Sequence, residues 1–168
     1  NLGAIATYGE TEEIINGFVY QWGRKDPIRT DFYFQESNMT SIENAISNPT
    51  IVYYSHDNHW QQDNNTSLWT KSQKTIYDPC PVGYKVPHRK VWLSFSKTES
   101  YNGDIKDMNI SGEYEYALGA YMIYDGTNTT FYPVGTSIRN GSAWGNHGDW
   151  GEYWTTESSG SNIAYQFE

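Results

Sequence analysis

The sequence predicts an α+β fold, built as one domain over residues 1–168. The length suits one domain with its own hydrophobic core. The composition includes 15 Tyr and 7 Trp but lacks the Leu-rich periodic runs of a helical bundle, which favours strands and turns. Two short helical patterns lie in the first part of the chain and strand patterns dominate the second, as expected for an α+β domain.

The first helix is expected to follow residue 40. Thr40 and Glu43 have the spacing of a capping box, in which Thr40 is the N-cap residue. The step from Asn48 to Pro49 ends the helical pattern. Three apolar residues share one face of this helix: Ile42, Ala45 and Ile46.

The second helix is expected to follow a proline-rich corner, residues 76–87. Pro79 and Pro81 exclude helix and favour extended conformations in the residues before them. Pro87 suits the first position of a helix, where its missing N–H costs nothing. Three apolar residues then share one helical face: Val91, Trp92 and Phe95. We therefore expect a short helix that Trp92 holds to the core.

Strand signals occur in six segments: 18–22, 51–54, 114–124, 129–134, 152–156 and 163–167. Residues 114–124 are apolar on both faces, which is typical of a central strand, and a turn at 125–128 leads to the next strand. The second half therefore predicts an antiparallel sheet. The polar segment 55–75 contains Trp60 and Trp69, and we expect these two rings to hold it to the fold.

Charge and apolar patterns argue against several classes of protein. The formal net charge of −9 disfavours binding to the phosphates of nucleic acid. No stretch is apolar for long enough to cross a bilayer, and no signal-peptide pattern opens the sequence. Asn1 looks like an internal start, so we expect a fragment of a longer protein. Cys80, the single cysteine, is either a buried thiol or half of a disulfide whose partner lies elsewhere.

Three segments together resemble one protein family. They are Tyr-Gln-Trp-Gly-Arg-Lys-Asp-Pro at 20–27, Asp-Pro-Cys-Pro-Val-Gly-Tyr-Lys-Val-Pro at 78–87, and Tyr-Trp-Thr-Thr at 153–156, followed by Ala164, Tyr165 and Phe167. In this order they resemble the major paralogous domain family of Bacteroidetes and Fibrobacter surface proteins, which often occurs in fimbrillin-like proteins. The resemblance covers residues 18–168. Family members usually continue into a segment with a second cysteine, which this sequence lacks.

The resemblance implies a C-type-lectin-like fold. In such a fold two short helices pack on small antiparallel sheets, and long loops on the sheet carry the binding surface. It also implies a location at the bacterial cell surface, outside the outer membrane. These implications come from the family and agree with the α+β pattern of the sequence.

Residues 139–151, called here the tryptophan loop, are the best candidate for a ligand site. Their mixture of Trp with Asn, Ser, Gly, His and Asp resembles an antibody paratope, where rings supply rigid contact area and small polar residues supply hydrogen bonds. The predicted ligand-binding residues are Arg139, Asn140, Trp144, Asn146, His147, Asp149, Trp150 and Tyr153. Trp144 and Trp150 have an alternative role, which is to hold the loop to the sheet.

The sequence predicts no catalytic residue, no metal site and no cofactor. The His-Asp-Asn-His cluster at 56–59 lacks the further ligands that a metal requires. Asp63, Asp125 and Asp149 form no EF-hand pattern, and the Glu-Pro-Asn and Trp-Asn-Asp motifs of calcium-dependent lectins are missing. No nucleophile elbow occurs, and Cys80 belongs to the structural corner.

These observations lead to a non-enzymatic, adhesin-like domain that binds a glycan or a protein on another cell or surface. A sharper hypothesis is that retroelement activity diversifies the tryptophan loop, because adenine-directed codon changes favour Asn, Tyr, Asp, Ser and His. The alternative is a structural subunit of a pilus or surface assembly. Its aromatic loops would dock to a neighbouring pilin or domain and bind no free ligand.

Overall fold

The computed structural model describes residues 18–28, 34–55, 60–98, 107–112, 119–123, 126–133, 137–139, 142–144, 153–158 and 164–167. This part of the chain is α+β, as the sequence predicts. The helices are α2 (Ile42–Ser47) and α3 (Arg89–Leu93). The strands are β1 (Phe34–Glu36), β2 (Ile51–Tyr53), β3 (Gly119–Ile123), β4 (Thr129–Pro133), β5 (Ser137–Arg139), β6 (Ser142–Trp144), β7 (Tyr153–Ser158) and β8 (Ala164–Phe167). None of the described helices has the length and apolar character needed to cross a membrane.

The described strands form four pairs. Three pairs are antiparallel: β3 with β4 and β7 with β8, which lie in segments where strands are predicted, and β5 with β6, where no strand is predicted. The fourth pair, β1 with β2, is parallel, with Phe34 opposite Ile51 and Glu36 opposite Tyr53. The expectation of antiparallel sheets alone is therefore wrong for this pair. Helix α2 connects β1 to β2 and provides the crossover that parallel strands require.

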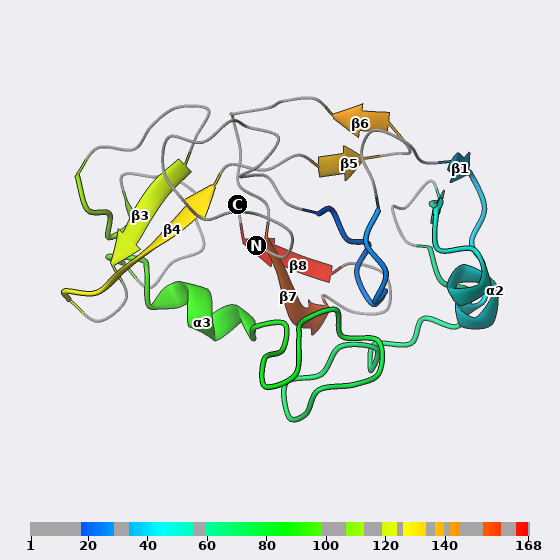
Figure 1. Ribbon diagram of the computed structural model, residues 1–168, viewed down its shortest axis with the longest axis horizontal. Coiled ribbons are helices and arrows are strands. Elements are labelled where there is room, and N and C mark those ends of the chain that lie inside the picture. Colours follow the sequence, from blue (N-terminus) through cyan, green and yellow to red (C-terminus); the bar gives the residue numbers. More distant parts are fainter. Residues whose placement is uncertain are drawn as a thin grey trace.

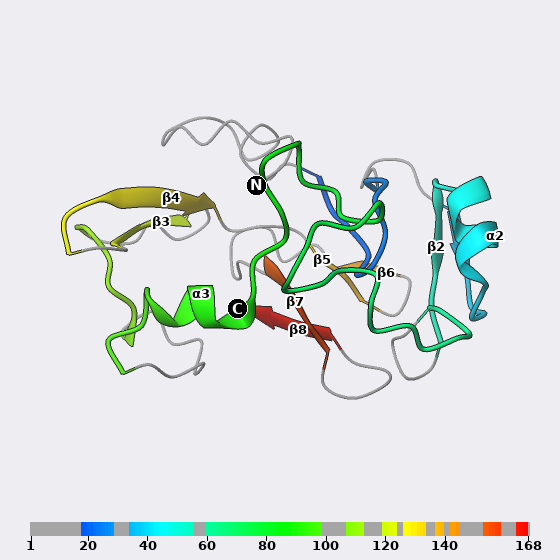
Figure 2. The same cartoon turned by 90° about the horizontal axis from the view of Figure 1, so that it is seen from below.

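The elements are arranged along the long axis of the molecule (Figure 1). α2, β1 and β2 lie at one end, α3, β3 and β4 lie at the other, and β7 and β8 cross the middle. Figure 2 shows the same order from below, with α3 and β8 side by side. β7 and β8 therefore lie between the elements of the two ends.

Helix α2 begins one residue later than the capping-box pattern predicts. Its N-cap is Ser41, whose hydroxyl accepts a hydrogen bond of 3.2 Å from the N–H of Asn44. The prediction of Thr40 as the cap is wrong, because the backbone of Thr40 is bonded on both sides to residues 60–62. The helix ends before Asn48, as predicted.

Helix α3 also has a different cap from the predicted one. The N-cap is His88, whose Nδ1 accepts a 3.1 Å hydrogen bond from the N–H of Lys90. Pro87 lies before the cap, so its predicted place at the first helical position is wrong. The carbonyl of Pro87 instead accepts a 2.9 Å hydrogen bond from the N–H of Thr156, which joins the corner to β7.

The buried faces of both helices are narrower than the sequence predicts. Trp92 and Phe95 are buried, as expected. Val91 on α3 and Ile46 on α2, which the sequence places on the apolar faces of these helices, are 49% and 53% exposed. Each helix has fewer than two turns, so few of its side chains reach the core.

The predicted strand at 18–22 is wrong. Val19 makes one isolated bridge, in which its carbonyl accepts a 2.8 Å hydrogen bond from the N–H of Ile28. A turn at Gly23, with φ of +82°, separates the two residues. A Cβ atom at Gly23 would lie 2.6 Å from Cδ1 of Leu68, so the backbone passes against this buried side chain.

The other strand predictions agree with the structure, although most of the observed strands are shorter than the predicted segments. β2 lies within 51–54, β4 within 129–134, and β8 within 163–167, while β7 extends past its predicted end to Ser158. β3 lies within 114–124, and among the described residues it pairs with β4 alone, so its central position stays a prediction.

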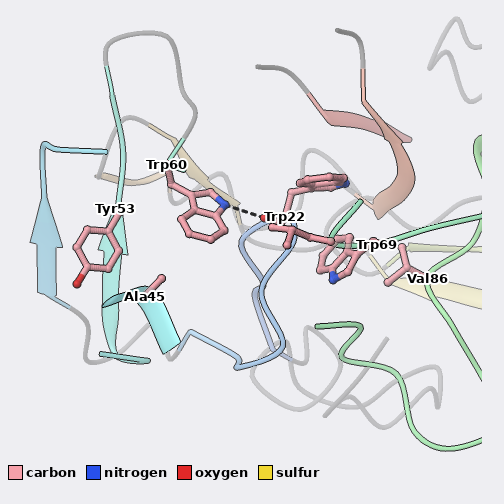
Figure 3. Close-up of a cluster of buried hydrophobic side chains, with 7 residues drawn as sticks. Trp22, Ala45, Tyr53, Trp60, Trp69 and Val86 are labelled. Atoms are coloured by element: carbon pink, nitrogen blue, oxygen red, sulfur yellow. Dashed lines mark hydrogen bonds between the residues drawn. The ribbon is translucent and has the colours of Figure 1, made fainter. Parts of the chain in front are cut away.

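One hydrophobic cluster, called here the first cluster, occupies the middle of the molecule and the α2 end. Its buried residues are Trp22, Ala45, Tyr53, Trp60, Leu68, Trp69 and Val86. In Figure 3, Trp60 lies between Tyr53 and Trp22, and its indole donates to the carbonyl of Trp22 over 2.7 Å. Burial of Trp60 and Trp69 confirms that these rings hold the polar segment 55–75 to the fold.

The second cluster lies beneath α3. Its buried residues are Trp92, Phe95 and Met108, and the half-buried Ile110, Tyr132 and Tyr153 pack against them. Strand β7 joins the two clusters, because Trp154 packs against the first and Tyr153 against the second. Trp154 is therefore part of the scaffold.

Candidate functional site

The tryptophan loop is less irregular than the sequence predicts. Its first part forms a hairpin, in which β5 pairs with β6, Arg139 lies opposite Ser142, and Ser137 lies opposite Trp144. The prediction of a loop throughout 139–151 is therefore wrong for these positions. Two of the predicted ligand residues, Arg139 and Trp144, belong to the strands of this hairpin.

Five predicted ligand residues lie outside the described part of the chain. They are Asn140, Asn146, His147, Asp149 and Trp150. In the sequence, Asn140 lies between β5 and β6, and the other four lie between β6 and the start of β7 at Tyr153.

Tyr153 is packed at the downstream end of the loop. Its ring centroid lies 5.4 Å from that of Trp92 and 5.2 Å from that of Tyr132. Burial raises the pKa of the Tyr153 hydroxyl, and the neighbouring Tyr132 raises it further. The hydroxyl is therefore protonated at neutral pH. Tyr153 fixes one end of the loop to the second cluster, and its role as a ligand contact stays a prediction.

Polar side chains join α3 to β7 near the same place. His88 Nε2 contacts Glu157 Oε1, and Arg89 Nε forms an ion pair with Glu157 Oε2 over 3.4 Å. Since Nδ1 of His88 caps α3, both ring nitrogens of this residue are engaged. His88 thus supports β7, and the expected role of Trp92 in holding the helix to the core is confirmed by its packing in the second cluster.

Asp78 organises the proline-rich corner from inside. One carboxylate oxygen accepts from the N–H of Cys80 and the other from the N–H of Val86, each over 2.9 Å. Lys74 Nζ lies 2.8 Å from the same carboxylate. Burial raises the pKa of Asp78, but the hydrogen bonds from Lys74, Val86 and Cys80 outweigh burial, so its pKa lies below the ordinary value.

Cys80 is a half-buried free thiol. Burial raises its pKa to about 11, and the charge of Asp78 and a hydrogen bond to it act in the same direction. The thiolate is the nucleophilic form, so Cys80 reacts poorly at neutral pH. Both alternatives from the sequence, a buried thiol and a disulfide to a cysteine elsewhere, stay predictions.

Arg24 is a structural residue that sequence reasoning missed. Its buried guanidinium donates to four backbone carbonyls and to one side-chain oxygen, those of Ala45, Asn48, Pro49 and Ile51 and of Gln21. Its carbon lies 5.8 Å from the ring centroids of both Tyr53 and Trp60. Burial lowers the pKa of Arg24, and the charges of Asp26 and Tyr53 oppose that change. Arg24 thus joins the segment 18–28 to the end of α2.

The described residues contain no group of three or more His, Cys, Asp and Glu side chains arranged to hold a metal ion. The cluster at 56–59 and the acidic residues Asp125 and Asp149 fall outside these residues. The expectations of no metal and no cofactor stay predictions.

Comparison of the chain with protein-family models, with curated proteins and with solved structures finds no match. The family resemblance therefore depends on the motifs at 20–27, 78–87 and 153–156 alone. In the structure these three motifs meet: Trp22 Nε1 donates to the carbonyl of Thr155 over 2.9 Å, and the N–H of Thr156 donates to Pro87.

Proposed function

We propose that this chain is a surface domain with a C-type-lectin-like fold, which binds a glycan or a protein through the tryptophan loop. One observation carries the proposal. β7, which follows the loop directly, is fixed to the rest of the molecule on both sides, through Tyr153 and Trp154. A rigid strand that presents a long loop is the arrangement in which loops carry binding function.

The division of the tryptophans supports the same proposal. Four indoles donate to backbone carbonyls inside the scaffold, namely those of Trp22, Trp60, Trp69 and Trp154. Trp92 packs in the second cluster. The remaining two, Trp144 and Trp150, belong to the loop rich in Asn, Ser and Gly. We expect them to stack on a sugar ring or an apolar protein surface.

The proposed fold draws on the packing of α3 on β7 and β8. A proline-rich corner leads into this helix, and the hydrogen bond between Thr156 and Pro87 holds the corner to the strand. The same order, with long loops beyond the strand, is what the family resemblance implies. We propose that the domain acts outside the outer membrane, as part of a longer protein, without enzymatic activity.

The test is a double variant, Trp144→Ala with Trp150→Ala, screened with the parent domain against glycans and glycoproteins. We expect at least about a tenfold loss of affinity, since buried aromatic residues dominate most interfaces. Ile46→Ala is the matched control, because it removes an exposed apolar side chain on α2. Equal binding by the double variant and the parent, with both folded, would show that the loop is not the site.

A structural subunit remains the second candidate, and one observation favours it. The proline-rich corner exposes Ile76, Val82 and Tyr84, which are 78%, 95% and 71% accessible. Apolar side chains on a surface are commonly covered in an assembly. If Trp144 and Trp150 become protected only when the domain assembles, and no free ligand binds, the structural role is the correct one.

A further inference from the structure

The proline-rich corner presents its apolar residues on a rigid support. The N–H of Tyr84 donates to the carbonyl of Pro81 over 3.0 Å, and Gly83 between them has φ of +89°, as a type II turn requires. Val82 lies at the tip of this turn and is 95% exposed. Asp78 holds the base of the turn through its two backbone hydrogen bonds.

The preceding residues form the other side of the same lobe. Trp69 Nε1 donates to the carbonyl of Tyr77 over 2.8 Å, and the Lys85 ammonium donates to the carbonyl of Lys71. Residues 68–90, called here the basic lobe, form the green loops at the bottom of Figure 1 and the start of α3. The lobe is thus cross-linked within itself, and its exposed apolar residues are held in place.

The lobe has the opposite charge to the rest of the chain. It contains five of the 11 basic residues and one of the 20 acidic residues, so its formal charge is +4 and that of the remaining chain is −13. Lys71, Lys85 and Lys90 are exposed and form no ion pair with any described carboxylate. An apolar tip on a segment of net positive charge fits an apolar surface that carries carboxylates.

A surface of that kind lies on α2 of the same chain. Ile46 and Met39 are 53% and 40% exposed, and Glu43 on α2 is exposed between them in sequence. Gln62 Nε2 donates to the carbonyl of Met39 over 3.3 Å, and the exposed Asp63 follows Gln62 in the sequence. In Figure 1, α2 lies at one end of the molecule, apart from the green loops of the basic lobe.

We propose that the basic lobe of one copy docks on the α2 surface of a second copy of this chain. Val82 and Tyr84 pack against Met39 and Ile46, and the lysines of the lobe face the carboxylates of the acceptor. The contact is heterologous, because lobe against lobe would bring two positive surfaces together. Heterologous contacts that do not close into a ring extend from copy to copy. The proposed contact involves only four apolar side chains, so we expect a weak affinity, with a Kd on the order of 100 µM.

Complementary variants test the contact in the isolated domain. Val82→Asp with Tyr84→Asp removes the donor surface and leaves the acceptor, and Ile46→Asp removes the acceptor and leaves the donor. All three side chains are exposed, so we expect the variants to fold. Val91→Asp, on α3 away from the tip, is the matched control.

The measurement is sedimentation velocity over a range of concentrations. We expect the parent and Val91→Asp to grow beyond dimers as concentration rises, with growth suppressed in about 500 mM salt. Each surface variant alone stays monomeric, with self-association weakened at least about tenfold. A mixture of the donor-deficient and acceptor-deficient variants forms a one-to-one dimer and stops there, because one intact contact remains.

Three results would overturn the proposal. They are a parent that stays monomeric at low salt, self-association that neither surface variant changes, and a mixture that forms no dimer. Sedimentation of a monomeric parent with phosphatidylglycerol vesicles, lost in Val82→Asp with Tyr84→Asp, would assign the lobe to a membrane surface instead. Variants at Trp144 and Trp150 keep self-association, so this proposal and the ligand-binding proposal fail separately.

Discussion

The two aromatic clusters of this molecule are built in different ways. In the first cluster the indoles of Trp22, Trp60 and Trp69 each donate a hydrogen bond of 2.7–2.9 Å to a backbone carbonyl. In the second cluster the described interactions are between rings, with the centroid of Tyr132 5.2 Å from that of Trp92 and 5.4 Å from that of Phe95.

This difference separates two tasks of the scaffold. A directional bond from a buried indole to a carbonyl of a distant segment specifies which segments meet, and its loss leaves a buried acceptor without a partner. Ring packing supplies area and tolerates replacement by another apolar side chain more easily. The first cluster therefore fixes the chain path of the corner and the segment 55–75, whereas the second supports Tyr153, which follows the tryptophan loop in the sequence.

The largest expected effect on stability follows from replacing Arg24, whose guanidinium lies beside Tyr53 and Trp60 of the first cluster. Arg24→Met leaves four backbone carbonyls without their common donor, and we expect a loss of about 4 kcal/mol in the free energy of unfolding. Chemical denaturation measures this loss. The exposed neighbour Lys25 provides the control, since Lys25→Met should change stability by less than about 0.5 kcal/mol. Equal effects of the two variants would contradict the role assigned to Arg24.

A second pair of variants compares the two clusters directly. Trp69→Phe keeps a ring but removes the donor to the carbonyl of Tyr77, and we expect a loss of about 3 kcal/mol. Phe95→Leu in the second cluster keeps apolar volume and should lose only about 1 kcal/mol. Urea denaturation of both variants gives the ratio. If Phe95→Leu lowered the free energy of unfolding as much as Trp69→Phe, the proposed difference between the two clusters would be contradicted.

A smaller effect, dependent on pH, is expected at Asp78, which joins the first cluster to the corner. Its pKa is lower in the folded state, so its ionised form contributes stability above the unfolded pKa of about 3.9, and this contribution is lost as the pH falls through the folded value. We expect Asp78→Asn to cost about 2 kcal/mol at pH 7 and progressively less in acid. Thermal unfolding from pH 7 to pH 2 measures the difference. A constant difference across that range would contradict the prediction.

The sequence predicted those parts of the fold that local signals determine. The hairpin partners at 119–133, the end of α2 at Asn48 and the buried Trp92 each follow from alternation, a stop signal or helical spacing. The pairing of β1 with β2 was missed because three residues carry too little pattern. The shift of the cap from Thr40 to Ser41 has a tertiary cause, since Thr40 is bonded to residues 60–62.

Among the supporting residues, the role of Asp78 could be predicted from the sequence, whereas that of Arg24 could not. An Asp before Pro often accepts a hydrogen bond from the N–H two residues on, and Asp78 does so with Cys80. Four of the five partners of Arg24 are backbone carbonyls between Ala45 and Ile51, and backbone carbonyls carry no sequence signature. For the tryptophan loop, composition gave the hypothesis, and the structure adds the hairpin in its first part and the packed Tyr153 after it.

The central claim is that five tryptophans build the scaffold and two are kept for a ligand. Solvent paramagnetic relaxation of the indole signals, with each of the seven tryptophans assigned by single replacement, tests it directly. We predict strong protection of Trp22, Trp60, Trp69, Trp92 and Trp154. Trp144 and Trp150 should relax fast in the free domain and become protected by a bound glycan or protein. Protection of Trp144 and Trp150 equal to that of Trp69 in the free, monomeric domain would contradict the account.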